Sequence, residues 1–288
     1  MRRIVLIGST GLLGSAFLNA LTNYEVFPLG RKVLEKDATE SIFDLLVSIK
    51  PEIVVNCAAH TDVEMAEQNP QLDYSVNARL PALIADACKK ANCMLVHFSS
   101  TGCYGDGKTL AYTEHDQLHP TTKHHAAKRD GENAIRASGC SHLIFRLGWL
   151  YGGAPKQRRN FVWNRLVEAA SVSVLESDMT QMGCPTHVSD VISQVMRVLE
   201  VGQAGTFNLA AHGFASRFDY VSEIVSASRL ECTVKPGGAY IRFAPVAKNE
   251  MAINQGLQQL GLDQMNDWRG PLRLYVQQLL LSPDWLSR

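Results

Sequence analysis

The chain has 288 residues, of which 46% are hydrophobic and 19% charged, as in ordinary globular proteins. This length accommodates one large α/β domain, or a nucleotide-binding domain with a smaller lobe attached. The 28 basic side chains balance the 28 acidic ones. We therefore expect neither nucleic acid nor an anionic membrane as a partner, because no net field attracts either.

The N-terminal stretch MRRIVLIGST places basic residues before an apolar run, as a signal peptide does. Its apolar run is too short, and it ends in a glycine-rich turn instead of a cleavage site. No stretch approaches the length of a membrane-spanning helix. The seven cysteines are scattered, mostly inside apolar runs, which predicts free thiols in a reducing compartment and a cytoplasmic protein.

The first half of the chain alternates β-rich runs with segments of helical spacing. Strands are predicted at 3–8, 24–29, 52–57, 93–99 and 142–148, with helices in LLGSAFLNALT, ESIFDLLVSIK and NARLPALIADACKKA. The strands are almost continuously apolar, as strands buried on both faces must be. This alternation predicts an α/β fold with a Rossmann-type, doubly wound parallel sheet.

After residue 150 the alternation loosens, beginning with the basic connection GGAPKQRRN. The elements expected next are a helix at 160–171, a strand at 172–176, a helix at 188–201, a strand at 205–210, and helices near 217–228, 254–261 and 268–281. We predict an NAD(P)-binding Rossmann domain over 1–150, to which elements of about 183–211 return. A smaller substrate-binding lobe would comprise mainly 151–182 and 212–288.

The first predicted strand runs directly into the glycine-rich sequence GSTGLLG. Between a strand and a helix, such a turn presents backbone amides and a helix N-terminus to a pyrophosphate, and a side chain would block the approach. The predicted cofactor-binding residues of this turn are Gly8, Thr10, Gly11, Leu12, Leu13 and Gly14.

Two further stretches indicate which dinucleotide is bound. The second strand ends in LGRK, without the acidic residue that usually bonds the ribose of NAD. Arg31, together with Lys32, suits the 2′-phosphate of NADP, so we favour NADP and keep NAD as the alternative. The small residues Ala58 and Ala59 follow the third strand and leave room for the cofactor. Two solvated loop charges are the competing interpretation of LGRK.

Several motifs along nearly the whole chain resemble one family. They are NCAAHTDVEMAE, SSTGCYG, FRLGWLYG, NF at 160–161 and QMGCPT at 181–186. In this order the chain resembles the extended short-chain dehydrogenases/reductases, and most of all the dTDP-4-dehydrorhamnose reductase family. The resemblance implies an NADP-dependent reductase of a 4-keto nucleotide sugar, in deoxysugar or surface-polysaccharide biosynthesis.

The resemblance also implies a catalytic serine or threonine, a tyrosine, and a lysine four residues after the tyrosine. Ser100 fits the first position and Lys128 the last. The tyrosine position falls on His124, 24 residues after Ser100, so the chain departs from the pattern at the proton donor. A neighbouring Lys⁺ lowers the pKa of a tyrosine, but it disfavours imidazolium and pushes the pKa of a histidine below about 6.5.

Three interpretations of the histidine compete. His124 is a working proton donor; or His125 is used, although it lies one residue off the expected helix face; or catalysis is lost and the protein only binds nucleotides. Tyr104 and Tyr112 are not obvious substitutes. We favour retained catalysis, because the serine and the lysine keep their expected spacing. No metal is expected, since no acidic or thiol ligand joins the histidines at helical spacing.

The substrate lobe carries further resemblances. They imply that Trp149 lies beside the hexose, that Arg146 lies beneath the site, and that Asn160 closes over the nucleotide sugar with the QMGCPT loop. An ion pair inside the fold is the alternative for Arg146. Thr180 replaces an aspartate often found in the family, which leaves the sugar open. Diphosphate ligands or an exposed basic loop are equally consistent with Arg158, Arg159, Arg242 and Lys248.

The leading hypothesis is therefore a reductase that takes a nucleotide sugar as substrate. A nucleotide-sugar epimerase or dehydratase is the second class, and the dehydratase is disfavoured because Thr101 and Gly102 stand where an acid–base pair is wanted. A catalytically impaired NAD(P)- or nucleotide-sugar-binding protein is the third. The base, the sugar and the oligomeric state stay open at this point, with a homodimer as one option.

Overall fold

The computed structural model describes residues 1–30, 38–155, 157 and 159–288. Within this part of the chain, six strands form a parallel sheet in the order β10–β5–β4–β3–β1–β2. They are β1 (Arg3–Ile7), β2 (Glu25–Leu29), β3 (Ile53–Asn56), β4 (Met94–Ser100), β5 (His142–Leu147) and β10 (Gly205–Leu209). The predicted doubly wound Rossmann-type sheet is thereby confirmed.

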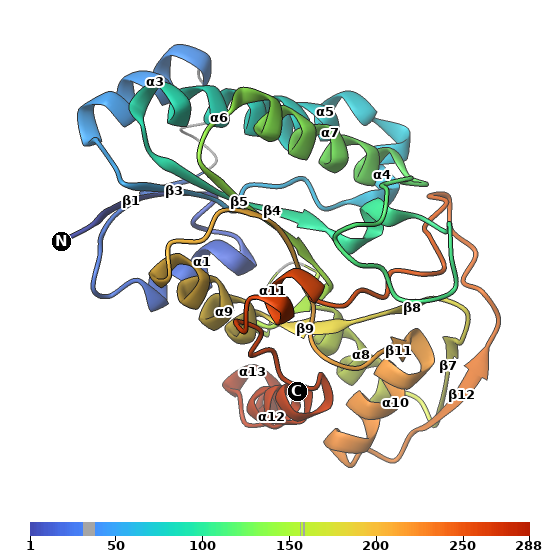
Figure 1. Cartoon of the computed structure of the whole chain (residues 1–288). Helices are drawn as coiled ribbons and strands as arrows, with labels where there is room; N and C mark the ends of the chain where they lie inside the picture. Colours follow the sequence, from blue (N-terminus) through green and yellow to red (C-terminus); the bar gives the residue numbers. More distant parts are fainter. Residues whose placement is uncertain (31–37, 156, 158) are drawn as a thin grey trace.

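Helices cover both faces of this sheet (Figure 1). On one face lie α3 (Ala38–Ile49), α6 (Leu80–Ala91) and α7 (Lys123–Ser138), and on the other α1 (Leu12–Ala20) and α9 (Val188–Glu200). Successive residues of β1 enter opposite cores: Ile4 packs with the α1 layer and Val5 with the α6 layer. A strand buried on both faces needs apolar side chains at every position, which explains the unbroken apolar runs.

The remaining elements of the first half lie between β3 and α7. They are α4 (Val63–Gln68), α5 (Pro70–Tyr74), the π-helical turn η1 (Ser75–Arg79) and the 3₁₀ helix η2 (Thr101–Tyr104). No helix was predicted between β3 and residue 77. Asp62 begins α4 by accepting from the Met65 amide, and Pro70 begins α5, where the missing N–H costs no hydrogen bond.

The second half forms a smaller lobe with its own aromatic core, which includes Tyr151, Trp163, Tyr220, Trp268 and Tyr275. Its elements are β6 (Trp149–Tyr151), α8 (Phe161–Ala169), β7 (Val174–Asp178), β8 (Met182–Gly183), β9 (Pro185–His187), β11 (Ala215–Ser216), α10 (Arg217–Ser228), β12 (Thr233–Gly237), α12 (Arg269–Leu280) and α13 (Pro283–Leu286). In contrast, α9, β10 and α11 (Gln255–Gln259) pack in the core beside the main sheet. The helices expected in this half are therefore present.

Two further features concern the helices and the cysteines. None of the helices in the described ranges is long and apolar enough to span a bilayer. All seven cysteines are free thiols, and five of them are buried.

Helix α7 packs closely against η1 at Gly131. A Cβ atom there would lie 2.3 Å from the Asn77 carbonyl oxygen. Gly131→Ala should therefore lower the free energy of unfolding by about 1–2 kcal/mol, despite the better helix propensity of alanine. Urea unfolding measures the change.

Gly270→Ala is the matched control, because Gly270 is also helical and a Cβ atom there meets nothing within 4 Å. It should raise the free energy of unfolding by up to about 1 kcal/mol. Equal stabilisation by both substitutions would contradict the tight contact at Gly131.

Candidate active site

In the sheet, β2 lies on one side of β1 and β3 on the other, so the strand order reverses at β1. In a doubly wound sheet, a dinucleotide binds in the crevice at such a reversal, outside the carboxyl ends of the strands. Gly8, just after β1, has φ +77°, and a Cβ atom there would lie 2.6 Å from the Ala58 nitrogen. At Gly14 a Cβ atom would lie 2.2 Å from the Gly8 carbonyl oxygen. Both glycines are required for the close packing of the turn, the first helix and the loop after β3.

The other predicted cofactor residues divide into two groups. Thr10 and Gly11 are exposed, and Gly11 caps α1 without a side-chain hydrogen bond. The first-turn amides of α1 therefore face a surface that can receive an anion. Leu12 is half-buried, and Leu13 is buried in the core with its side chain away from any ligand. Ala59, like Ala58, is half-buried, while Arg31 and Lys32 lie outside the described residues.

Ser100 and Lys128 both contact the carboxyl-terminal part of β4 or the turn that follows it. Ser100 is the last residue of the strand, and its hydroxyl oxygen accepts a hydrogen bond of 3.1 Å from the Gly102 amide. The Lys128 ammonium is buried and donates to the Phe98 carbonyl at 3.0 Å. Burial lowers the pKa of Lys128.

His124 is buried on the same helix as Lys128, one turn earlier, and is held by a carboxylate. Its Nδ1 lies 3.0 Å from Asp73 Oδ1. The same oxygen is 2.9 Å from His60 Nδ1 and 2.9 Å from the Asn77 side-chain nitrogen. Asp73 Oδ1 therefore accepts hydrogen bonds from three side chains in different parts of the chain.

The electrostatics of His124 follow from these neighbours. Burial lowers its pKa, the hydrogen bond from Nδ1 to Asp73 raises it, and the charge of Lys128 lowers it, with a result below the ordinary value. For Asp73, burial raises the pKa, but contacts with His124, His60 and Asn77 outweigh it and leave the pKa low. Asp73 is thus ionised at neutral pH.

His125 has a different environment. Its Nδ1 lies 3.1 Å from the Thr122 hydroxyl, and its ring packs against Gly102, where a Cβ atom would lie 2.2 Å from the ring. Burial lowers the pKa of His125 to about 3, so its imidazole is neutral. Tyr104 and Tyr112 are buried and stacked, and their hydroxyls donate to Asn208 Oδ1 and to the Gly105 carbonyl.

Two residues predicted to bind the substrate are engaged inside the fold. The Arg146 guanidinium donates to both oxygens of buried Glu132, with the shortest contact at 2.7 Å, and to the Tyr104 hydroxyl at 2.9 Å. This geometry favours internal pairing over substrate binding. Asn160 caps α8 by accepting from the Trp163 amide, and its nitrogen donates to the Tyr275 hydroxyl.

Trp149 lies at the junction of the two lobes. Its indole nitrogen donates to Glu250, and the Arg217 guanidinium lies 3.5 Å from its ring centroid. Burial raises the pKa of Glu250, only partly offset by the Trp149 bond and Arg217, and burial lowers the pKa of Arg217 to about 10. The indole is thus fixed between a carboxyl group and a guanidinium.

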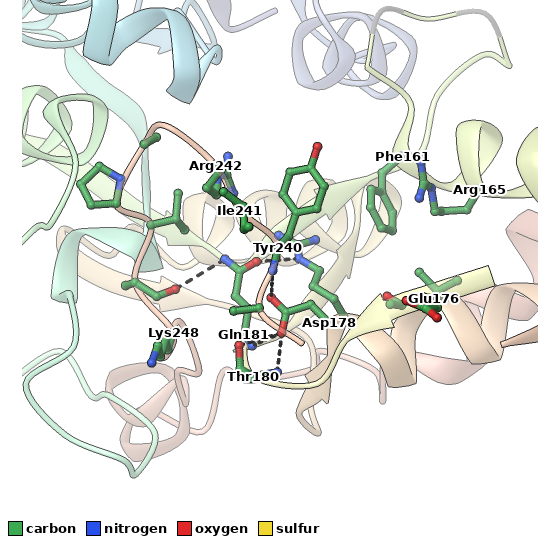
Figure 2. Close-up of a pocket in the computed structure, with 18 residues that line it drawn as sticks. Phe161, Arg165, Glu176, Asp178, Thr180, Gln181, Tyr240, Ile241, Arg242 and Lys248 are labelled. Atoms are coloured by element: carbon green, nitrogen blue, oxygen red, sulfur yellow. Dashed lines mark hydrogen bonds between the residues drawn. The ribbon is translucent and has the colours of Figure 1, made fainter. Parts of the chain in front are cut away.

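A cavity of about 660 Å³ opens beyond Arg217 (Figure 2). Its wall combines α8, β7, the loop after β7 and the segment 239–248. The charged side chains that line it are Arg165, Glu176, Asp178, Arg217, Arg242 and Lys248. Four cations face two carboxylates in this wall, and two of the cations, Arg165 and Arg242, also pair with Glu168 and Glu64. The positive charge of Arg217 and Lys248 is what makes the cavity suit an anion such as a diphosphate.

The residues predicted as possible diphosphate ligands do not all lie at the cavity. Arg242 and Lys248 line the cavity, and Thr180 also lines it. Arg159 instead pairs with Asp62, and Arg158 lies outside the described residues. Among the described residues, no group of three or more potential ligands could hold a metal ion.

Sequence reasoning missed four polar residues of this region: His60, Asp73, Arg217 and Glu250. Asp73 precedes Asn77 by four residues, a spacing that places both on one helical face. That signal was available in the sequence, but the segment was not recognised as helical. Nothing local predicts Glu250, because it reaches Trp149 across 101 residues.

Fold and site together define the class of extended short-chain dehydrogenases/reductases, with a glycine-rich turn after the first strand, a serine at the end of β4 and a lysine on α7 that reaches this strand. Residues 1–281 match the family described as the RmlD substrate binding domain, and the chain belongs to this family.

Three similar proteins illustrate the relationship. The dTDP-4-dehydrorhamnose reductase of Mycolicibacterium smegmatis is 27% identical over 277 residues, covering 94% of this chain and 84% of that protein. A crystal structure of such a reductase from Clostridium acetobutylicum has a TM-score of 0.92 at 27% identity, covering 97% and 100% of the two chains. One from Bacillus anthracis, in complex with NADP, has a TM-score of 0.91 at 24% identity, covering 96% and 100%.

The buried ion pair of Arg146 supports a prediction about stability. Glu132→Gln should lower the free energy of unfolding by about 3 kcal/mol, because it leaves a buried guanidinium without its charge partner. Arg136→Gln removes an exposed partner of the same carboxylate and should cost less than about 1 kcal/mol. Urea unfolding at pH 7 measures the stability of both variants. An equal loss of stability in the two variants would contradict the buried ion pair between Arg146 and Glu132.

Proposed function

We propose that the protein is an NADP-dependent reductase of a 4-keto nucleotide sugar, acting in deoxysugar or surface-polysaccharide biosynthesis. One observation carries the proposal: Ser100, Lys128 and a buried imidazole, His124, occur around the end of β4 in a chain of this family. Family membership supports the substrate class, since the similar proteins named above are called dTDP-4-dehydrorhamnose reductases.

The cofactor assignment depends on the glycine-rich turn. Gly8 and Gly14 leave the space that a Cβ atom would fill, and the first-turn amides of α1 suit a pyrophosphate. NADP is favoured because a relative of the same fold was solved with it and because Arg31 suits a 2′-phosphate. When bound, this dinucleotide supplies the hydride.

The chain itself supplies binding and the proton. The Ser100 hydroxyl accepts from the Gly102 amide, which leaves its own hydrogen to bond the substrate carbonyl. Lys128 places a positive charge beside the reacting groups and would bond the nicotinamide ribose. His124, as imidazolium, gives its proton to the alkoxide that forms. Trp149 and the cavity beyond Arg217 would hold the sugar and the diphosphate.

We also propose that the enzyme works in the cytoplasm. The free thiols support a reducing compartment.

The activity is tested by NADPH oxidation with dTDP-, UDP- and GDP-linked 4-keto sugars. His124→Ala should lower kcat about 100-fold, the usual contribution of a general acid, with little change in NADPH affinity. Fluorescence titration with NADPH is the control for binding.

Three outcomes separate the alternatives. An isomeric product without net NADPH oxidation would indicate an epimerase. Nucleotide binding without turnover would indicate a binding protein. Unchanged turnover in His124→Ala would remove this histidine from the mechanism.

The cavity generates a separate prediction. Lys248→Gln removes one cation from its wall and should raise KM for the nucleotide sugar about fivefold, corresponding to about 1 kcal/mol, with kcat kept. Lys235→Gln, an exposed substitution on β12 outside the wall, is the control. If KM rises equally in both variants, the cavity is not the diphosphate site.

A further inference from the structure

The hydrogen bonds of His124 are concentrated on one ring nitrogen. In the described part of the chain, Asp73 Oδ1 at 3.0 Å and Asn77 Nδ2 at 3.4 Å both face Nδ1. The Asn77 nitrogen is itself a donor to the His60 carbonyl and to Asp73, each at 2.9 Å. A donor cannot bond Nδ1–H, so Asp73 is the true partner of that hydrogen.

Asp73 is suited to accept and not to donate. Its side chain is almost fully buried, and Oδ1 faces three donors, whereas Oδ2 has no partner within the described structure. Burial opposes its ionisation, but these donors more than compensate, and the carboxyl pKa stays below its usual range. An ionised carboxylate fixes Nδ1 of His124 as the protonated nitrogen.

We propose that Asp73 is a positioning residue for the proton donor: it holds Nδ1–H of His124, so that Nε2 delivers the proton and only the imidazolium can do so. This inference rests on the proposed reductase function. The neutral ring has no hydrogen on Nε2 in this arrangement, so it can accept a hydrogen bond there but cannot quench an alkoxide.

The proton balance is simple. With NADPH bound, the dinucleotide would supply the hydride to the keto carbon and be left as NADP⁺, and the electron pair of the substrate's C=O π bond would move to oxygen. The Nε2–H bond of the His124 imidazolium breaks, and its proton forms the new hydroxyl. The ring is left neutral with Nδ1–H still on Asp73, and Nε2 regains a proton from water after the product leaves.

The pH dependence has a definite sign. Reduction requires the protonated ring, so kcat/KM should fall as the pH rises through the His124 pKa. Burial and Lys128 lower that pKa, while Asp73 opposes both. Without the carboxylate the fall should begin at lower pH. The titratable groups around the ring are Asp73 on α5, His60 after β3, and His125 and Lys128 on α7. Glu67 on α4 accepts from the Lys123 amide at the start of α7.

A purely structural acceptor would not need a charge. Asp73→Asn keeps the size of the side chain and an oxygen that can accept from His124, but it removes the negative charge. The comparison therefore isolates the electrostatic contribution from the loss of a hydrogen bond.

The first experiment uses NMR of ¹⁵N-histidine-labelled full-length protein, with His124→Gln to assign the resonance among the nine histidines. In the wild-type protein above the midpoint, the neutral ring should carry its hydrogen on Nδ1. In Asp73→Asn the midpoint should move to lower pH by about one unit. A hydrogen on Nε2 in the wild-type protein, or an unmoved midpoint in the variant, would overturn the proposal.

The second experiment measures kcat/KM against pH. In Asp73→Asn the falling limb should shift as the NMR midpoint does, lowering the rate at pH 7 about tenfold with little change in NADPH affinity. Asp263→Asn alters another histidine–aspartate pair, with His212, and should leave the profile in place. In a His124→Gln background, which has no ring to titrate at this position, Asp73→Asn should no longer shift the residual profile, and a shift of the same size would overturn the proposal.

The two readouts distinguish two kinds of failure. If no 4-keto sugar is reduced but the tautomer and the midpoint behave as expected, the proposed reductase function fails and the role of Asp73 toward the ring stands. If the sugar is reduced while the ring carries its hydrogen on Nε2, the reductase stands and the positioning role fails.

Discussion

The close approach of α7 to η1 is the constraint from which the site follows. Because Gly131 has no side chain, the helix can approach the backbone at Asn77. That contact brings Asp73, one turn before Asn77, within hydrogen-bond distance of His124. The same helix lies over β4, where Lys128 reaches the Phe98 carbonyl. The contact between Gly131 and Asn77 therefore determines how α7, the Asp73 carboxylate and the end of β4 lie relative to one another.

Three polar side chains follow one another along α7 at intervals of four residues. His124, Lys128 and Glu132 are all buried, although a helical face directed at a sheet is usually apolar. Each has a defined partner: Asp73, the Phe98 carbonyl and Arg146. The first two are the proposed proton donor and active-site lysine, and the third anchors the helix to β5 through Arg146. One face of one helix therefore carries both proposed catalytic residues and a structural ion pair, at a cost in desolvation that each partner offsets.

Much of the fold could be predicted from local patterns, because strands buried on both faces and amphipathic helices leave their periodicity in the sequence. The glycine-rich turn and Lys128 were found in this way and through family resemblance. Arg146 and Asn160 were expected at the substrate through resemblance, and their internal contacts, with Glu132 and as a helix cap, were not predicted for Asn160 and were only an alternative for Arg146. Which partner a buried polar group takes depends on residues far away in the chain, and no local pattern records it.

The wall of the cavity is held at one point by a residue of the other half of the chain. Glu64 on α4 accepts from Arg242 at 2.6 Å and from the Ala244 amide at 2.9 Å. These contacts fasten the segment 239–248 to the nucleotide-binding half. Both charged side chains are partly exposed, so dissolved ions compete for them and the fastening weakens as ionic strength rises. Higher salt should thus loosen one of the contacts that hold this stretch of the cavity wall, while the bond from the Tyr240 amide to Asp178 also holds it.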